Sequence, residues 1–356
     1  MKYITMESAR HGPALGRRTL ILSPLSHGPI PLHIDFHSHF YPRAYLEGLK
    51  ESKGHVSLES GPGGEVILRY SGDYNVVVGG HVDLDERLKA MRGCGVDMQV
   101  VSLTTPGVDM EAPELGAKLA KVTNDAFGDI SEKFPDRFVA LATLPMRDPM
   151  AAADELERAV KDRGLRGAMV FSNAAGSPID GEEYMHFYEK AVKLDVPLFV
   201  HPTSPLNSVG MADYRLVPIM GFGVDTSLAI LRLVFSGVLE RLPGLKLVAT
   251  HTGGVFPYLR GRIDAAYRAY PETRARIPKP PSEYFKRIWL DTVCYDADVL
   301  ASSLAFWGPG KMVMGSDYPH QIGDLENCVR RVKGLELDGA DEKLVLGGNA
   351  ARLLNL

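Results

Sequence analysis

The stretch HIDFHSHF, residues 33–40, places an apolar run directly before two histidines that lie two positions apart. The run 32–36 is short and nearly unbroken in hydrophobicity, which is typical of a buried strand. Alternate side chains of a strand point to the same side, so His37 and His39 at its end can converge on one point. The pair alone fits either a metal site or a polar strand end.

Seven further apolar runs of the same kind follow, separated by helix-like segments with acidic starts and terminal glycines. They cover residues 98–103, 137–144, 166–171, 197–201, 246–251, 288–292 and 311–316. Eight strands that alternate with helices predict an α/β protein with a (β/α)8 barrel of the TIM type. The alternative is a doubly wound open sheet, which is disfavoured because no GxGxxG motif follows the first strand.

The predicted barrel spans residues 32–356, and residues 1–31 are expected to form an N-terminal tail. Residues 48–82 interrupt the alternation with glycine-rich sequence and short strand-like pieces. We interpret this segment as a small β insertion after strand 1. Because it follows the C-terminal end of that strand, it is expected over the face where barrels keep their active sites.

The net charge and the spacing of the cysteines limit which partners and which cellular compartment can be expected. The chain has 356 residues, a net charge of −4 and a pI of about 6.3. This balance, without a basic stripe, argues against nucleic acid as a partner. No apolar run approaches the ~20 residues of a membrane span, so no membrane association is expected. The widely spaced cysteines indicate reduced thiols in the cytoplasm, and they are Cys94, Cys294 and Cys328.

Histidine and aspartate side chains stand at the ends of four predicted strands. Strand 1 ends at His37 and His39, strand 5 at His201, strand 6 at His251 and strand 8 at Asp317. Imidazole nitrogen suits a borderline divalent metal, and a carboxylate completes a mixed nitrogen–oxygen shell. The predicted ligands, which leave one position open for water, are His37, His39, His201 and Asp317. Because all five side chains lie at one barrel face, we predict a metal site.

Several motifs resemble the amidohydrolase superfamily, in particular the branch of aminocarboxymuconate semialdehyde decarboxylase and related metal-dependent decarboxylases. They are DFHSHF, LFVHP, THTGGVFPYLRGRIDAAY, PPSEYF, MVMGSDYPH and LGGNAARLL, from about residue 32 to the C-terminus. The resemblance implies a distorted (β/α)8 barrel, a homodimer and one divalent metal, zinc first and manganese as the alternative.

Matched by position, the resemblance implies the same four metal ligands. It also implies that His251 is the catalytic histidine and that Arg262 reaches the neighbouring subunit's site to bind a substrate carboxylate. Strand 4 ends in GAMVFSNAAG, without the lysine that bridges two metals in related enzymes, so a single metal is expected.

Three positions depart from the pattern of that branch, and all concern the substrate pocket. Asn75 lies about where an insertion arginine binds a substrate carboxylate, Thr203 replaces a tryptophan, and His320 replaces an aromatic residue. We place His320 among the substrate-binding residues. Arg43, which follows strand 1, is a further candidate contact for an anionic substrate.

These features predict an enzyme, a carbon–carbon lyase. Its reaction is the metal-dependent, non-oxidative decarboxylation of a small unsaturated or aromatic acid, of the carboxymuconate semialdehyde or hydroxybenzoate type. Either His251 or Asp317 is expected to return the proton to carbon. The alternative is a hydrolase or hydratase of a small lactone, amide or enol acid, because one activated water serves both reactions. A metal-bound scaffold without turnover is disfavoured, since a structural site has no need of His251.

Overall fold

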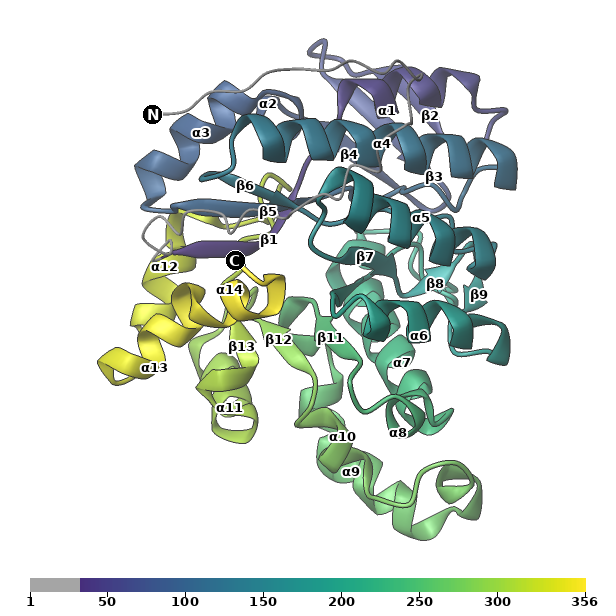
Figure 1. Cartoon of the computed structure of the whole chain (residues 1–356), viewed down its shortest axis with the longest axis vertical. Coiled ribbons are helices and arrows are strands. Elements are labelled where there is room, and N and C mark those ends of the chain that lie inside the picture. Colours follow the sequence, from purple (N-terminus) through teal and green to yellow (C-terminus); the bar gives the residue numbers. More distant parts are fainter. Residues whose placement is uncertain (1–32) are drawn as a thin grey trace, which may run out of the picture. The chain divides into compact units, whose positions relative to one another are not determined.

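Eight short apolar runs of the sequence form the parallel strands at the centre of the structure, a computed structural model that describes residues 33–356 (Figure 1). Their side chains are almost all buried, as predicted for strands covered on both faces. The strands are β1 (Ile34–His39), β5 (Met98–Ser102), β6 (Phe138–Ala140), β7 (Ala168–Phe171), β10 (Pro197–His201), β11 (Lys246–Ala249), β12 (Trp289–Asp291) and β13 (Met312–Val313). The predicted tail, 1–31, lies outside the described residues.

The strands form a ring with two seams. Parallel hydrogen-bonded pairs run in the order β1–β5–β6 and in the order β13–β12–β11–β10–β7. At one seam Ala142, beyond β6, pairs in parallel with Ala168 of β7. At the other, Tyr318 beyond β13 pairs with Ser38 of β1, and the His39 N–H donates to the Tyr318 carbonyl at 2.8 Å. The predicted distorted (β/α)8 barrel is confirmed, and the distortion lies at these seams.

Helices follow the strands, and their ends carry the caps that the sequence shows. Asp83 and Asp148 accept hydrogen bonds from the first backbone N–H groups of α3 and α5, which end at the left-handed Gly95 and Gly164. The longer helices are α3 (Leu84–Cys94), α4 (Pro113–Lys133), α5 (Pro149–Arg163), α6 (Met185–Lys193), α7 (Phe222–Phe235), α9 (Phe256–Ala269), α11 (Ala297–Trp307) and α12 (Leu325–Lys333). The shorter ones are α1 (Arg43–Gly48), α2 (Gly79–Val82), α8 (Val238–Arg241), α10 (Pro281–Phe285), α13 (Gly339–Lys343) and α14 (Asn349–Leu354).

The hydrophobic core has one part inside the ring of strands and another between the strands and the helices. The inner part takes alternate residues of the strands, such as Ile34 and Phe36 of β1 and Phe199 of β10. Leu353 and Leu354 of α14 belong to the same cluster. Because Ile34 opens its strand, α14 closes the N-terminal end of the barrel, and the C-terminal end is left for a site.

The segment after β1 contains a three-stranded antiparallel sheet. Its strands are β2 (Ser57–Ser60), β3 (Val66–Tyr70) and β4 (Asp73–Val77). The Tyr70 hydroxyl donates to Thr105 Oγ1 at 2.9 Å, and the Asn75 amide donates to the Thr105 carbonyl at 2.8 Å. Thr105 follows the C-terminal end of β5, so this sheet is fastened to the face of the barrel where the predicted metal site lies.

One helical stretch, Val217–Phe235, is long and apolar enough to span a membrane by length and composition, with a mean hydropathy of 1.5. Half of it is buried inside the protein, where Ile230, Leu233 and Val234 of α7 belong to the outer core. A buried core helix can meet the same criteria of length and hydropathy, so this stretch is weak evidence for a membrane span. Elsewhere in residues 33–356 no helix does.

Candidate metal centre

A β-bulge in β1 turns both histidines of the HxH pair towards the inside of the barrel. The pairing with β5 steps three residues along β1, from Asp35 to Ser38, but only two along β5. The extra residue shifts the alternation, so Phe36 and His37 both face inwards. Their rings lie 5.4 and 4.9 Å from the same buried ring, that of Phe199. Without the bulge, either the inner core or the histidine pair would face the helices.

The side chains predicted as ligands gather around one carboxylate. His37 Nε2 and His39 Nε2 lie 3.0 Å apart, and they lie 3.2 and 3.1 Å from Asp317 Oδ1. His201 and His251 each place a nitrogen within 4.8 Å of a His37 nitrogen and of an Asp317 oxygen. The four residues predicted as ligands are therefore brought together, and His251 joins them.

The other nitrogen of each of the three imidazoles predicted as ligands is held by the protein. His37 Nδ1 lies 2.6 Å from Asp291 Oδ2, His39 Nδ1 3.2 Å from Ser102 Oγ, and His201 Nδ1 2.8 Å from the Pro202 carbonyl. Such partners fix the ring and leave Nε2 for a metal. His201 Nε2 is buried without a hydrogen-bond partner among the described residues. This donor set and the unpartnered nitrogen fit a divalent ion.

The charges around the cluster favour a cation at its centre. Burial lowers the pKa of His37, but the charges of Asp317 and Asp291 outweigh burial and raise the pKa to about 10. Burial holds the pKa of His39 and that of His201 well below the usual value. Burial raises the pKa of Asp317, but the charge of His37 and the hydrogen bonds from His251, His37 and His39 together outweigh burial, and the pKa lies well below the usual value. Two neutral imidazoles and a carboxylate are in the protonation states that metal binding requires.

Asp291, at the end of β12, is a central residue that our sequence analysis missed. Besides His37 Nδ1, it accepts hydrogen bonds from the backbone N–H groups of His251 and Thr252 at 3.0 and 2.8 Å. These two residues have positive φ of 52° and 53°, a conformation that needs such support.

The backbone of Gly315 passes close to His37. A Cβ at Gly315 would lie 2.8 Å from the His37 Cβ, so only glycine admits this close approach.

Replacement of Asp291 with asparagine is expected to weaken metal binding by about 10- to 100-fold, because His37 loses its charged partner. The dissociation constant, measured by competition with a chelator, reports this effect. The matched control is Asp338→Asn, since Asp338 only caps α13. An affinity unchanged in the Asp291 variant would contradict the role assigned to this carboxylate.

Of the two residues predicted to bind substrate, one lies at the cluster and the other does not. His320 is brought to the cluster, with its ring 4.9 Å from that of His39 and its Nε2 2.9 Å from Thr104 Oγ1. Arg262 is exposed on α9 and does not belong to the group around Asp317.

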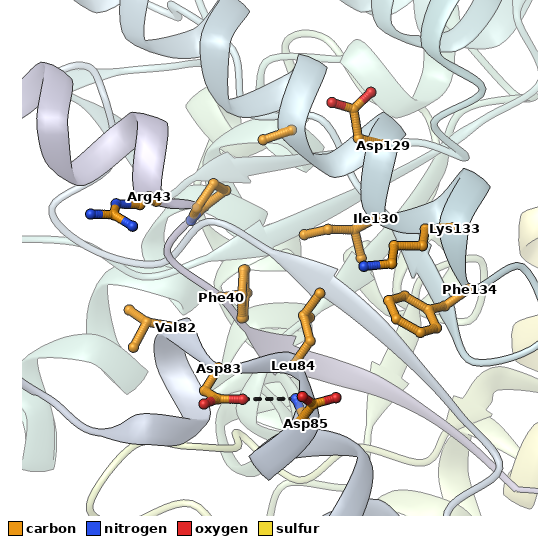
Figure 2. Close-up of a pocket in the computed structure, with 12 residues that line it drawn as sticks. Phe40, Arg43, Val82, Asp83, Leu84, Asp85, Asp129, Ile130, Lys133 and Phe134 are labelled. Atoms are coloured by element: carbon orange, nitrogen blue, oxygen red, sulfur yellow. Dashed lines mark hydrogen bonds between the residues drawn. The ribbon is translucent and has the colours of Figure 1, made fainter.

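Arg43 lies in a groove of about 400 Å³ between the start of α3 and the end of α4 (Figure 2). Its side chain is 91% exposed and pairs with Glu47 at 3.0 Å. The groove contains none of the clustered histidines. The structure therefore gives Arg43 no contact with the candidate metal centre.

Two of the departures noted in the sequence, together with the buried histidine His81 of the insertion, lie in the surroundings of the cluster. The Asn75 amide nitrogen donates hydrogen bonds to the Tyr41 hydroxyl, at 2.8 Å, and to the Thr105 carbonyl. Thr203 is buried, and its hydroxyl has no hydrogen-bond partner among the described residues. His81 is buried between Tyr41 and His320, with ring centroids 5.1 and 5.3 Å away.

Comparison with known proteins assigns the chain to a family. The model of the amidohydrolase family matches residues 34–356. The chain belongs to the amidohydrolase family. It is 31% identical over 333 residues to the 2-amino-3-carboxymuconate-6-semialdehyde decarboxylase of Dictyostelium discoideum, and the match covers 91% of this chain and 92% of that protein. The predicted family is therefore confirmed.

Two solved structures of decarboxylases share the fold. The 5-carboxyvanillate decarboxylase of Sphingomonas paucimobilis is 26% identical, with a TM-score of 0.80 and coverage of 91% of this chain and 99% of that chain. The dihydroxybenzoic acid decarboxylase of Polaromonas sp. JS666, solved with bound manganese and the inhibitor 2-nitroresorcinol, is 27% identical, with a TM-score of 0.76. That match covers 91% of this chain and 97% of the other. All three of these relatives are named as decarboxylases, and one of them was solved with bound manganese.

Proposed function

We propose that the protein is a metal-dependent, non-oxidative decarboxylase of a small aromatic acid, and hence a carbon–carbon lyase. The observation that carries this proposal is the buried group of imidazoles around the Asp317 carboxylate at the C-terminal end of the barrel. A group of this size suits one divalent ion. The named relatives support the reaction, because they act on 2-amino-3-carboxymuconate 6-semialdehyde, 5-carboxyvanillate and dihydroxybenzoic acid.

The ligands that we propose are His37, His39, His201 and Asp317. A divalent ion held by these residues would supply Lewis-acid stabilisation of the negative charge that loss of CO2 leaves on carbon. We propose zinc as the resident metal, with manganese as the alternative, because a mixed histidine and aspartate shell accepts either. Three free cysteines support a cytoplasmic location.

The reaction breaks the bond between carbon and carboxylate, leaves the electron pair on that carbon, and puts a proton in place of CO2. His251 is suited to carry this proton, because its Nε2 lies 3.6 Å from Asp317 Oδ2 and its side chain is 21% exposed. It can therefore exchange protons with solvent, while the 5% exposed Asp317 carboxylate orients the imidazole. His320, beside His39, borders the space that remains for the substrate.

The test is release of CO2 by the metal-loaded protein from a panel of acids. The panel contains 2-amino-3-carboxymuconate 6-semialdehyde, 5-carboxyvanillate, 2,6-dihydroxybenzoate and 6-methylsalicylate. We expect at least one acid to lose CO2, and treatment with a chelator to stop the loss. If no acid loses CO2 but a lactone or amide is opened, the protein is a hydrolase and the proposal is wrong.

We further propose a homodimer in which Arg262 enters the partner's site. Arg262 is exposed on α9. Exposed apolar side chains, which a monomer would leave in contact with water, lie on α9, on α7 and on residues 217–221 directly before α7. These side chains are Ile219, Met220, Val224, Leu228 and Tyr258. A second copy of the chain would cover this surface and bring an arginine, which grips a carboxylate with two hydrogen bonds, to the neighbouring metal centre.

Arg262→Ala is expected to lower kcat/KM by about 10- to 100-fold while bound metal stays in place, because a charge-assisted bond to the substrate is lost. Subunit mixing distinguishes an arginine from the partner from one in the same chain. Arg262→Ala and Asp317→Ala chains, each weak alone, should recover up to about a quarter of the unmodified activity when mixed in equal amounts. A mixture no better than its components would contradict the crossing arginine.

A further inference from the structure

Arg87 of α3 is a fully buried arginine that the chemistry above does not use. Its guanidinium lies outside the ring of strands and donates five hydrogen bonds. Nη2 donates to the His39 carbonyl and, at 2.8 Å, to the Gly80 carbonyl. Nη1 donates to Gln99 Oε1 at 2.8 Å and to Ser38 Oγ at 3.2 Å, and Nε to the Gly80 carbonyl at 3.2 Å. One side chain therefore ties β1, β5 and α2 together.

Each segment that Arg87 holds delivers a side chain to the candidate metal centre or to its immediate surroundings. β1 carries the two histidines of the HxH pair, β5 carries Ser102, which contacts one of them, and α2 carries His81. A fourth segment joins them, because the Arg87 Cζ lies 4.9 Å from the ring centroid of Tyr318, which directly follows Asp317. Arg87 is the point at which these four segments meet behind the cluster.

The charge of Arg87 is balanced through one neutral amide. Gln99 accepts from Arg87 with its oxygen and donates from Nε2 to Asp35 Oδ2 at 2.9 Å. The buried Asp35 Oδ1 in turn accepts the backbone N–H groups of His37 and Ser316, at 3.2 and 3.0 Å. The row from Arg87 through Gln99 to Asp35 thus fixes the backbone on both sides of the bulge in β1 and at the end of β13.

We propose that Arg87 is a positioning residue of the metal centre and that it sets the affinity of the centre for its divalent ion. The inference rests on the proposed metal site. Burying a guanidinium costs desolvation free energy that an apolar side chain would not, so packing alone does not account for an arginine at this place. Its planar fork holds the carbonyls of two segments at a fixed spacing, which the single ammonium of lysine does not reproduce.

Two mild substitutions test the proposal without removing the helix that carries Arg87. Arg87→Lys keeps the charge and loses the fork, and Gln99→Leu keeps both charges and cuts the link between them. Each metal-free variant is titrated with Mn²⁺ against a competing chelator, and its thermal midpoint is recorded without metal. We expect Mn²⁺ binding to weaken by about 10- to 100-fold in both, because the ligand backbone loses its support. The electron paramagnetic resonance spectrum of the bound Mn²⁺ should change as well.

The matched control is Arg287→Met, since Arg287 also holds two carbonyls, those of Leu239 and Leu242 at 2.8 and 3.3 Å, away from the cluster. This control should lower the thermal midpoint and leave Mn²⁺ affinity unchanged. If Arg87→Lys and Gln99→Leu behave like the control, Arg87 is only structural and the proposal is overturned. Failure of the unmodified protein to bind Mn²⁺ would refute the metal centre itself. A protein that binds Mn²⁺ in an Arg87-dependent manner but releases no CO2 would support Arg87 and refute only the decarboxylase.

Discussion

Replacement of Asp317 with alanine is expected to abolish metal binding and to lower kcat/KM by about 10³-fold or more, because the carboxylate is the anionic member of the proposed ligand shell. Asp317 Oδ1 lies 3.2 and 3.1 Å from the facing nitrogens of His37 and His39. Without it, two imidazoles would face each other at 3.0 Å with no carboxylate oxygen beside their facing nitrogens. Metal content by elemental analysis and CO2 release report both effects.

The control for this variant is a carboxylate that follows β12, the strand next to β13, and has a structural role away from the cluster. Asp296 is exposed and caps α11 by accepting the backbone N–H groups of Asp298 and Val299. Asp296→Ala should cost about 1 kcal/mol of unfolding free energy and leave metal content unchanged. Retention of one metal ion per chain by the Asp317 variant would show that the ligand shell is built from other residues.

His251→Gln is expected to lower kcat by about 10²- to 10⁴-fold while the protein still binds metal, because a proton carrier is lost and the ligands are not. His251 differs from His37, His39 and His201 in its partial exposure, and its Nε2 lies 3.6 Å from the Asp317 carboxylate, against 3.2 and 3.1 Å for His37 and His39. Its Nδ1 is buried and has no hydrogen-bond partner among the described residues. The readouts are single-turnover rates and metal content, measured on the same preparation.

His33→Gln is the matched control for His251, because His33 stands at the opposite end of β1 and contacts the Gly95 carbonyl at 2.6 Å. It should leave both readouts unchanged. If His251→Gln loses metal as completely as His201→Gln does, His251 is a ligand, and another residue must carry the proton.

Much of the barrel follows from the sequence because parallel strands are buried on both faces and stand out as apolar runs. All eight runs contain a strand of the ring, although β6 and β13 are shorter than predicted. Strand ends are where barrels place functional side chains, so one rule brings His37, His201 and Asp317 to a common region. The rule does not reveal the bulge in β1, which depends on its pairing with β5 and not on local sequence.

The supporting residues around the cluster are harder to predict, for different reasons. Asp291 follows the same strand-end rule, and the sequence WLDT at the end of β12 carries a signal that sequence analysis could have used. Arg87 carries none, because it lies in an acid-rich helical segment and reads as a solvent-exposed charge. Its burial arises from four segments that meet only in the folded chain. The residues that contact Arg87 in the folded chain, rather than the sequence of its own helix, decide whether it supports the cluster.

We propose above all that decarboxylation depends on one divalent ion, which the residues around Asp317 would hold. The most direct measurement is a titration of the metal-free protein with Mn²⁺ or Zn²⁺ during assay of CO2 release from an accepted acid. The account predicts no release without metal, a linear rise, and a plateau at one equivalent per chain, with no rise for the Asp317→Ala variant. A plateau at two equivalents, or CO2 release that persists after the metal is removed, would contradict it.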